Sequence, residues 1–100
     1  MGNVLVVTID HPPANALTPG LRKALMQALH EAKAARAVVL CGEGRNFSAA
    51  TSVDTEPGKP SLADLCLAIE QLDRPVVAAL HGAVVGAGAE LALAAHARVA

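Results

Sequence analysis

Residues 75–91, PVVAALHGAVVGAGAEL, constrain the fold of this chain more than any other stretch. The run 75–80 has the length and the Val-rich, apolar composition of a fully buried strand. The glycines that follow allow the backbone to approach another strand or a ligand closely. From Ala87 onward Ala and Leu dominate, as a helix favours, and Glu90 is the lone carboxylate of that segment. The stretch therefore predicts a strand, a glycine-rich bend and a helix over 87–96 that carries an acid one turn in.

Other runs have the composition of strands. Residues 4–9 and 37–41 are short, rich in β-branched residues and Leu, and end at turn-forming residues. Residues 98–100 resemble the beginning of a further strand. The stretch 45–59 has no apolar period, and loops of this length in compact domains are usually functional or disordered.

Helix signals lie between these strands. A Thr-Pro pair and apolar residues at spacings of three and four predict a helix over 18–32, with Arg22 on its polar face. A Ser-x-x-Asp capping box predicts a second helix over 61–72. The resulting βαβαβα order predicts an α/β fold with a largely parallel sheet and right-handed crossovers, in one domain over 1–100.

Composition excludes several classes of function. The net charge of -1 and the scattered basic residues argue against a nucleic-acid partner. No apolar run is long enough for a membrane span, and no secretory signal is visible, so we expect a cytoplasmic protein. The cysteines and histidines have no metal-ligand spacing, and we expect no metal site. With 53% hydrophobic residues the chain is more apolar than a lone small domain should be, which suggests missing sequence or a missing partner.

Local motifs leave the function open. Neither 42–44 nor 86–88 has the glycine spacing of a dinucleotide fingerprint, and no P-loop is present. Ser48 has no histidine arrangement that would support a nucleophile. Glu90 has two interpretations. As the third helical residue it would bond back to the N-cap amide, or it would face a pocket and act as a general base.

Taken in order, four blocks resemble the crotonase, or enoyl-CoA hydratase/isomerase, superfamily. They are residues 9–17, 36–44, 47–53 and 74–100, so the likeness runs over essentially the whole chain. The amino-acid sequence of the last block is most similar to the hydratase half of bifunctional hydratase/3-hydroxyacyl-CoA dehydrogenases. The resemblance implies the N-terminal part of a spiral of ββα turns that binds an acyl-CoA thioester. It also implies a trimer-based homo-oligomer and no separate cofactor, since CoA is part of the substrate.

The resemblance also assigns roles to residues. The backbone amides of Thr51 and Ala87 would form an oxyanion hole over the thioester carbonyl, and Glu90 would be the first of two carboxylates that handle water and proton. Losing one such amide donor typically costs about 3 kcal/mol of transition-state stabilisation. The implied substrate-binding positions are Ala14, Asn15, Ala49, Ala50, Gly86 and Gly88.

Departures from the family pattern keep alternatives open. Ala50, Thr51 and Ser52 stand where the family usually has Gly, Ala and Asp, and Ala87 replaces the central glycine of Gly-Gly-Gly. If position 50 or 87 needs a positive φ, the added Cβ costs about 1 kcal/mol or more. The second family carboxylate would fall after residue 100. The sequence therefore favours a 2-enoyl-CoA hydratase, with an isomerase or thioester hydrolase, and a non-catalytic acyl-CoA-binding or assembly module, as alternatives. By itself the 100-residue chain is expected to be poorly soluble and inactive.

Overall fold

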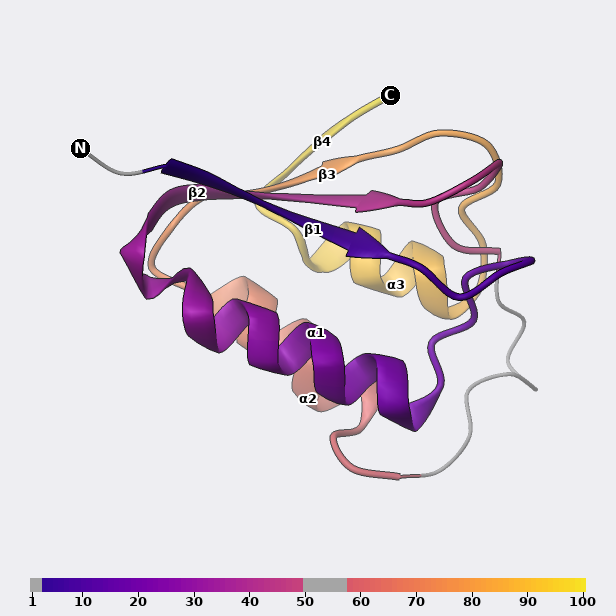
Figure 1. Ribbon diagram of the computed structural model, residues 1–100, viewed down its shortest axis with the longest axis horizontal. Coiled ribbons are helices and arrows are strands. Elements are labelled where there is room, and N and C mark those ends of the chain that lie inside the picture. Colours follow the sequence, from indigo (N-terminus) through magenta and orange to yellow (C-terminus); the bar gives the residue numbers. More distant parts are fainter. Residues whose placement is uncertain (1–2, 50–57) are drawn as a thin grey trace.

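The computed structural model describes residues 3–49 and 58–100, in which four strands form one sheet (Figure 1). Along the chain the elements are β1 (Asn3–Ile9), α1 (Pro19–Glu31), the 3-10 helix η1 (Ala32–Ala34), β2 (Ala35–Gly42), α2 (Leu62–Gln71), β3 (Val76–Ala79), α3 (Ala87–Ala94) and β4 (Ala97–Val99). This order confirms the predicted alternation of strands and helices and the α/β class.

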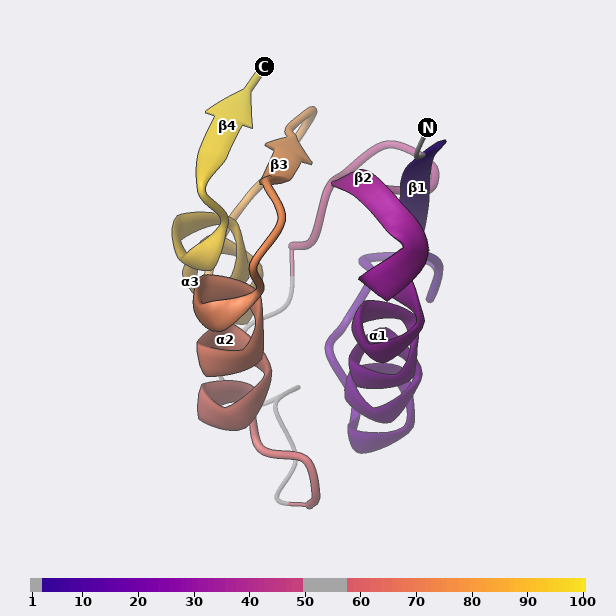
Figure 2. The ribbon, with the colours of Figure 1, turned by 90° about the vertical axis from the view of Figure 1, so that its left-hand side faces the viewer.

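The sheet is parallel throughout, with the strand order β1-β2-β3-β4. Each connection between neighbouring strands passes through a helix, as a parallel pair requires. All of these helices lie on the same face of the sheet (Figures 1 and 2). The loops that follow β1, β2 and β3 therefore meet at one edge of the sheet.

Some elements differ from the sequence prediction, mostly by one or two residues at their ends. The short helix η1 was not predicted, and β2 begins directly after it at Ala35. The helix α3 ends at Ala94 rather than at residue 96. The His96 amide already donates to Val76 O at 2.9 Å, so at this point the chain has left the helix and joined the sheet.

Capping bonds explain where α1 and α2 begin. Thr18 Oγ1 accepts from Leu21 N at 3.3 Å, with Pro19 as the first helical residue. Ser61 Oγ accepts from Asp64 N at 3.0 Å, and Asp64 Oδ2 accepts from Ser61 N at 3.2 Å. These bonds confirm the predicted capping box, and the bond from the Ser61 amide, followed by that involving its hydroxyl, lowers the pKa of the Asp64 carboxyl. Each N-cap contributes about 1 kcal/mol to stability.

The buried core lies between the sheet and the helices. Side chains at alternate strand positions face the helices, so that Val7, Leu40 and Ala78 form one buried row across three strands. The helices add Leu25 and Leu29 from α1, Leu65 and Ile69 from α2, and Leu91 from α3. The apolar face predicted for α1 therefore packs on the sheet, through Leu25 and Leu29.

Arg22 does not lie on the polar face where periodicity places it. It is only 1% exposed, and its guanidinium donates to Pro60 O at 2.8 Å and Leu17 O at 2.6 Å. Main-chain carbonyls thus replace water around this cation, and they tie the segment before α2 to α1. The prediction was wrong because these acceptors come from parts of the chain that helical spacing does not include.

No helix of the described residues covers the opposite face of the sheet (Figure 2). Val6 is 59% exposed, and its neighbours across the sheet on this face are Val39 and Val77. Val4 and Val99 are also exposed. Parallel sheets are normally covered on both faces. This uncovered face therefore accounts for part of the apolar excess noted in the composition.

Candidate functional site

Three loops meet at the carboxyl edge of the sheet. The loop after β1 is joined to the loop after β2 by a bond from Ala49 N to Ala14 O of 2.8 Å. The loop after β2 is joined to the loop after β3 by bonds from Phe47 N to His81 O, 2.9 Å, and from Val85 N to Ser48 O, 3.1 Å. In open α/β sheets ligands bind outside the carboxyl ends of the strands. The candidate site is therefore at this edge.

Asn15 organises the meeting point of these loops with a buried side chain. Its Nδ2 donates to Glu43 O and Asn46 O at 2.9 Å each, and to Phe47 O at 3.2 Å. Its Oδ1 accepts from His11 N at 2.8 Å. The residue has a φ of 57° and is 1% exposed. The resemblance implied only a substrate-binding position for Asn15 and gave no role to its side chain, although asparagine is one of the few residues that tolerate a positive φ.

Gly86 is the glycine that α3 requires. It is the N-cap of α3, with a φ of 58°, a conformation that disfavours any residue with a Cβ. Ala87 is already helical, so its methyl group meets no backbone strain there. The substitution that departs from the family's glycine triplet therefore leaves the backbone at position 87 intact.

One backbone amide in the first turn of α3 differs from the others in its hydrogen bonding. The amides of Ala89 and Glu90 both donate to Gly86 O at 3.1 Å, and Gly88 N donates to Val85 O at 3.1 Å. Within the described ranges 3–49 and 58–100, no acceptor is recorded for the Ala87 amide, and Ala87 is only 3% exposed. A buried amide without an acceptor is rare in folded proteins. This donor, at the positive end of the helix dipole, is suited to an oxyanion.

Glu90 is the fourth residue of α3, not the third, and it does not cap the helix. The N-cap of α3 receives no side-chain hydrogen bond, and Glu90 is exposed. Its side chain lines a groove of about 360 Å³ between α2 and α3. The other lining residues are Leu62, Ala63, Cys66, Glu70, Leu93 and Ala94. The capping interpretation is therefore not supported, and Glu90 is one of the residues that line a partly apolar groove.

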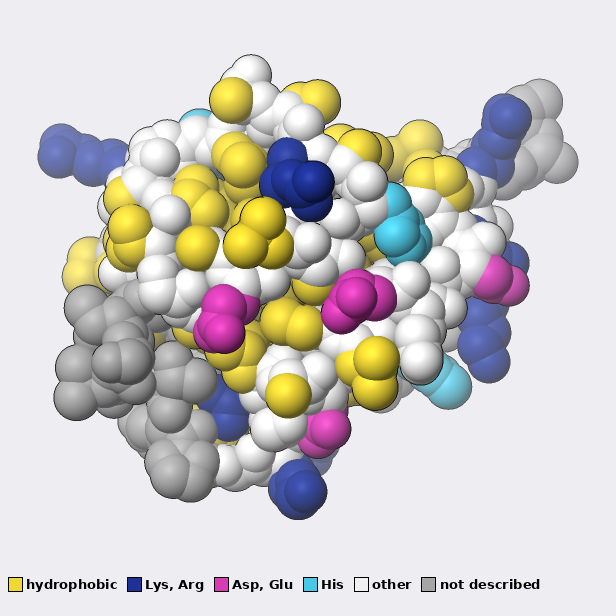
Figure 3. All heavy atoms as spheres, turned by 180° about the vertical axis from the view of Figure 1, so that it is seen from behind, with side chains coloured by type: hydrophobic (Ala, Val, Ile, Leu, Met, Phe, Trp, Pro, Cys, Tyr) yellow, Lys and Arg dark blue, Asp and Glu magenta, His cyan; other side chains and the backbone are white. Residues whose placement is uncertain are grey.

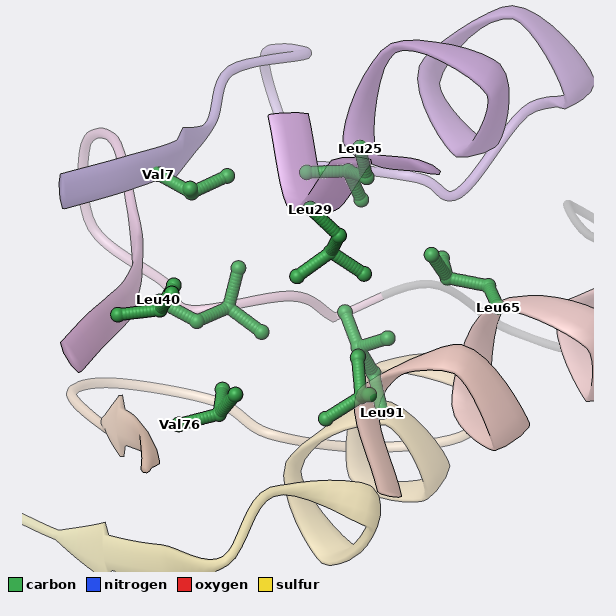
Figure 4. A pocket seen from close by; sticks show the side chains of 9 residues that line it. Val7, Leu25, Leu29, Leu40, Leu65, Val76 and Leu91 are labelled. Carbon is green, nitrogen blue, oxygen red and sulfur yellow. The ribbon is translucent and has the colours of Figure 1, made fainter. Parts of the chain in front are cut away.

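Figure 3 shows the face of the molecule formed by α2, α3 and β4, where hydrophobic side chains are exposed with acidic side chains among them. A more enclosed hollow lies inside the core between the sheet and the helices (Figure 4). Its volume is about 10 Å³, and every residue that lines it is apolar, including Val7, Leu29 and Leu91. Such a space is too small and too apolar for a substrate.

Cys66 also lines the groove and contacts Glu90. Its thiol donates to Glu90 O at 3.7 Å. Burial, and then the nearby Glu90 and Glu70 carboxylates, raise the pKa of Cys66 to about 11. The group is therefore a neutral thiol at physiological pH, and nothing activates it as a nucleophile. Sequence spacing did not reveal this contact between α2 and α3.

His81 and His96 pair with the backbone. His81 Nε2 lies 2.7 Å from Gly44 O. His96 Nδ1 accepts from Val76 N at 2.9 Å, and its Nε2 lies 3.1 Å from Glu70 O. Both contacts fit the Nε2–H tautomer, in which Nδ1 accepts and Nε2 donates. No group of side chains that could hold a metal ion occurs in the part of the chain that the structure describes. Among the same residues no helix is long and apolar enough to cross a membrane.

The structure brings most of the predicted site residues together. Ala14 and Asn15 lie against Ser48 and Ala49, while Ser48 in turn contacts the segment that leads into α3. That segment holds Gly86, Ala87, Gly88 and Glu90. Thr51 and Ala50, the other predicted oxyanion-hole and substrate-binding positions, lie outside the described residues.

Comparison with known proteins identifies the family. A family model described as enoyl-CoA hydratase/isomerase matches residues 1–100. The chain belongs to this family. Its sequence is 38% identical, over 110 residues, to a protein described as a probable enoyl-CoA hydratase of Bacillus subtilis. It is also 38% identical over 104 residues to the peroxisomal bifunctional enzyme of Danio rerio, which agrees with the predicted likeness to bifunctional proteins.

Solved structures of enoyl-CoA hydratase/isomerase family members share the fold. The enoyl-CoA hydratase from Polaromonas sp. JS666 has a TM-score of 0.86 and 32% identity, over 98% of this chain and 44% of that one. A monofunctional enoyl-CoA isomerase from M. smegmatis has a TM-score of 0.81, also at 32% identity, with 45% of that chain covered. The alignment with the Bacillus subtilis relative covers 97% of this chain but only 43% of that protein, so the chain spans less than half of its relative's length. The predicted crotonase-like fold, in its N-terminal part, is thereby confirmed.

Proposed function

We propose that the protein is a 2-enoyl-CoA hydratase, in which Glu90 is an acid/base and the Ala87 amide polarises the thioester carbonyl. The observation that carries this proposal is the pairing of these groups in the first turn of α3. The Ala87 amide is buried without an acceptor in the described residues, and Glu90 follows it on a groove between two helices.

The chemistry of hydration needs both groups. Water adds to C3 of the enoyl group and a proton adds to C2, and between these events negative charge develops on the thioester oxygen. A preorganised amide stabilises this charge without reorganisation, and each such donor contributes about 3 kcal/mol. Glu90 transfers a proton to or from the reacting water, a role worth about 10²- to 10⁴-fold in rate. We assign the second amide of the oxyanion hole to Thr51 and backbone contacts to CoA to Ala14, Asn15, Ala49 and Ala50.

The lining of the groove between α2 and α3 is suited to the acyl chain of such a substrate. Leu62, Ala63 and Leu93 give it apolar walls, and Glu90 stands at its side. An apolar groove with few polar groups is the usual form of a site for an apolar small molecule. In this proposal the acyl chain lies along the groove and the thioester faces the N-terminus of α3.

The test is Glu90→Gln in the protein as its source makes it, assayed for hydration of crotonyl-CoA. We expect kcat to fall by about 10²- to 10⁴-fold, because glutamine cannot transfer the proton. Glu31→Gln is the matched control, since Glu31 is an exposed carboxylate on α1, outside this groove. It removes the same charge and should leave kcat within about twofold, as surface substitutions usually do. Hydration that is equally fast in Glu90→Gln and wild type would refute the assignment.

An isomerase of the same fold is the second candidate, favoured by the likeness to the isomerase from M. smegmatis. An isomerase moves the double bond by removing one proton and returning it at another carbon, which one carboxylate can do. Turnover of a 3-enoyl-CoA that exceeds hydration of the 2-enoyl-CoA would favour this candidate. Release of free CoA would favour a thioester hydrolase, and tight binding without turnover would favour a non-catalytic acyl-CoA-binding module.

A further inference from the structure

Ser48 is a fully buried polar residue at the point where the three loops of the carboxyl edge meet. Its side chain is 0% exposed, and its Oγ donates to Asn15 O at 2.8 Å. Its carbonyl accepts from Val85 N at 3.1 Å, and Ser48 pairs with Val84 in an isolated parallel bridge. Ser48 thus joins the loop after β1 to the segment that leads into α3, and its hydroxyl is buried.

The first turn of α3 packs directly on Ser48. A Cβ at Gly88 would lie 2.4 Å from Ser48 O, 2.5 Å from its Cβ and 2.7 Å from its Oγ, distances that real side chains do not reach. The Gly88 amide donates to Val85 O, and the Val85 amide in turn donates to Ser48 O. Ser48 therefore supports the helix both by hydrogen bonds through Val85 and by close contact at Gly88. The Ala87 amide directly precedes this contact.

The other side of Ser48 is anchored by Asn15. The Asn15 side chain makes hydrogen bonds to His11, Glu43, Asn46 and Phe47, so the carbonyl that accepts from Ser48 belongs to a residue held on several sides. A buried network in which every member is paired rigidifies its surroundings. These bonds therefore fix the position of Ser48, and with it the start of α3, relative to the carboxyl ends of β1 and β2.

We propose that Ser48 is a positioning residue for catalysis, which holds the Ala87 amide and Glu90 in place through the first turn of α3. The inference rests on the proposed acyl-CoA chemistry. It assigns Ser48 no contact with the substrate. Its effect on the reaction passes through Gly88 and Val85, which hold the helix that carries the reacting groups.

The experiment compares Ser48→Ala and Ser48→Cys with wild type in the complete protein, with crotonyl-CoA as substrate. Because a small misplacement of catalytic groups lowers the rate strongly, we expect kcat to fall roughly tenfold in Ser48→Ala, with KM within about twofold. Ser48→Cys keeps the shape and a weaker donor, so its kcat should fall between the two. His96→Ala is the control, because it removes a side chain that bonds backbone at the opposite edge of the sheet.

The outcomes separate this inference from the proposed function. A fall in kcat in Ser48→Ala, with wild-type kcat in His96→Ala at a similar loss of melting temperature, supports the inference. An unchanged kcat in Ser48→Ala, in an active wild-type background, would overturn it and leave the proposed function standing. A wild-type protein that does not turn over any acyl-CoA would overturn the proposed function and this inference together.

Discussion

At both edges of the sheet, polar side chains form hydrogen bonds with backbone groups, but these bonds have different consequences at the two edges. At the amino edge, His96 accepts from Val76 N, and Arg74 donates to Ala35 O at 2.7 Å and to Lys33 O. At the carboxyl edge, Asn15 and Ser48 bond backbone groups of the loops in the same way. Both edges are thus closed by polar side chains that pair with backbone.

The edges differ in what they leave available. At the carboxyl edge the network holds a helix start whose Ala87 amide has no recorded acceptor in the described residues, followed by the exposed Glu90. At the amino edge the side chains of His96 and Arg74 are themselves paired. Polar bonding at one edge therefore stabilises the fold, and at the other it also presents reactive groups. Substitutions should separate these contributions.

The largest effect is expected for Gly88→Ala. The new Cβ would meet backbone of Ser48 at 2.4 Å, so α3 must shift, and a displacement of about 1 Å costs on the order of 100-fold in rate. Gly20→Ala is the matched control, because Gly20 lies in α1 and a Cβ there has nothing within 4 Å. It should stabilise the protein by up to about 1 kcal/mol. Assays of kcat with melting curves test the pair, and wild-type kcat in Gly88→Ala would contradict the geometry.

Asn15→Ala should give the largest loss of stability. It removes side-chain bonds to His11 N, Glu43 O, Asn46 O and Phe47 O. At about 1 kcal/mol for each bond, and a further cost for alanine at a positive φ, we expect a loss of about 3–5 kcal/mol. Urea unfolding measures it. Gln27→Ala, which removes an exposed bond to Glu31 on α1, should change stability by less than about 0.5 kcal/mol. A loss in Asn15→Ala no greater than in this control would show that the network is not stabilising.

At the amino edge, His96→Ala should cost about 1–2 kcal/mol, because it leaves Val76 N without its ring acceptor. We expect kcat to stay at the wild-type value at temperatures well below unfolding. Thermal melting and steady-state kinetics on the same preparation check both statements. A fall in kcat as large as that in Gly88→Ala would remove the distinction between the edges.

The smallest effect concerns pH and Cys66 in the groove. Burial raises the pKa of this thiol from 9.0 to about 11, so the folded state disfavours the thiolate. The stability that this shift provides is complete below pH 9 and is lost as pH rises through about 11. Unfolding free energy measured between these values should fall less steeply in Cys66→Ala, with Cys41→Ala as the control. Equal slopes in wild type and Cys66→Ala would contradict the burial of the thiol.

Local chemistry made much of the fold predictable. The caps at Thr18 and Ser61 lie within a few residues of the amides they bond, so the sequence shows both partners at once. The order of strands and helices follows from periods of two and 3.6 residues, which are also local. The family resemblance correctly identified the N-terminal crotonase-like fold, and it pointed to Ala87 and Glu90, whose roles stay proposals.

Contacts between distant segments were not predictable in this way. Periodicity placed Arg22 in solvent, whereas carbonyls of residues 17 and 60 hold it in the interior. The contact of Cys66 with Glu90 depends on how two helices pack. The part played by Ser48 depends on three loops that are far apart in the chain.

Short-range rules of backbone geometry and apolar spacing thus determined the elements, their order and the parallel sheet from the amino-acid sequence alone. Only the tertiary structure decided which amide in the first turn of α3 has no acceptor among the described residues, which glycine must accept a close neighbour and which polar side chains are buried. The reason is physical. Capping and periodicity act over a few residues, whereas burial and hydrogen-bond pairing depend on segments that meet only when the chain has folded.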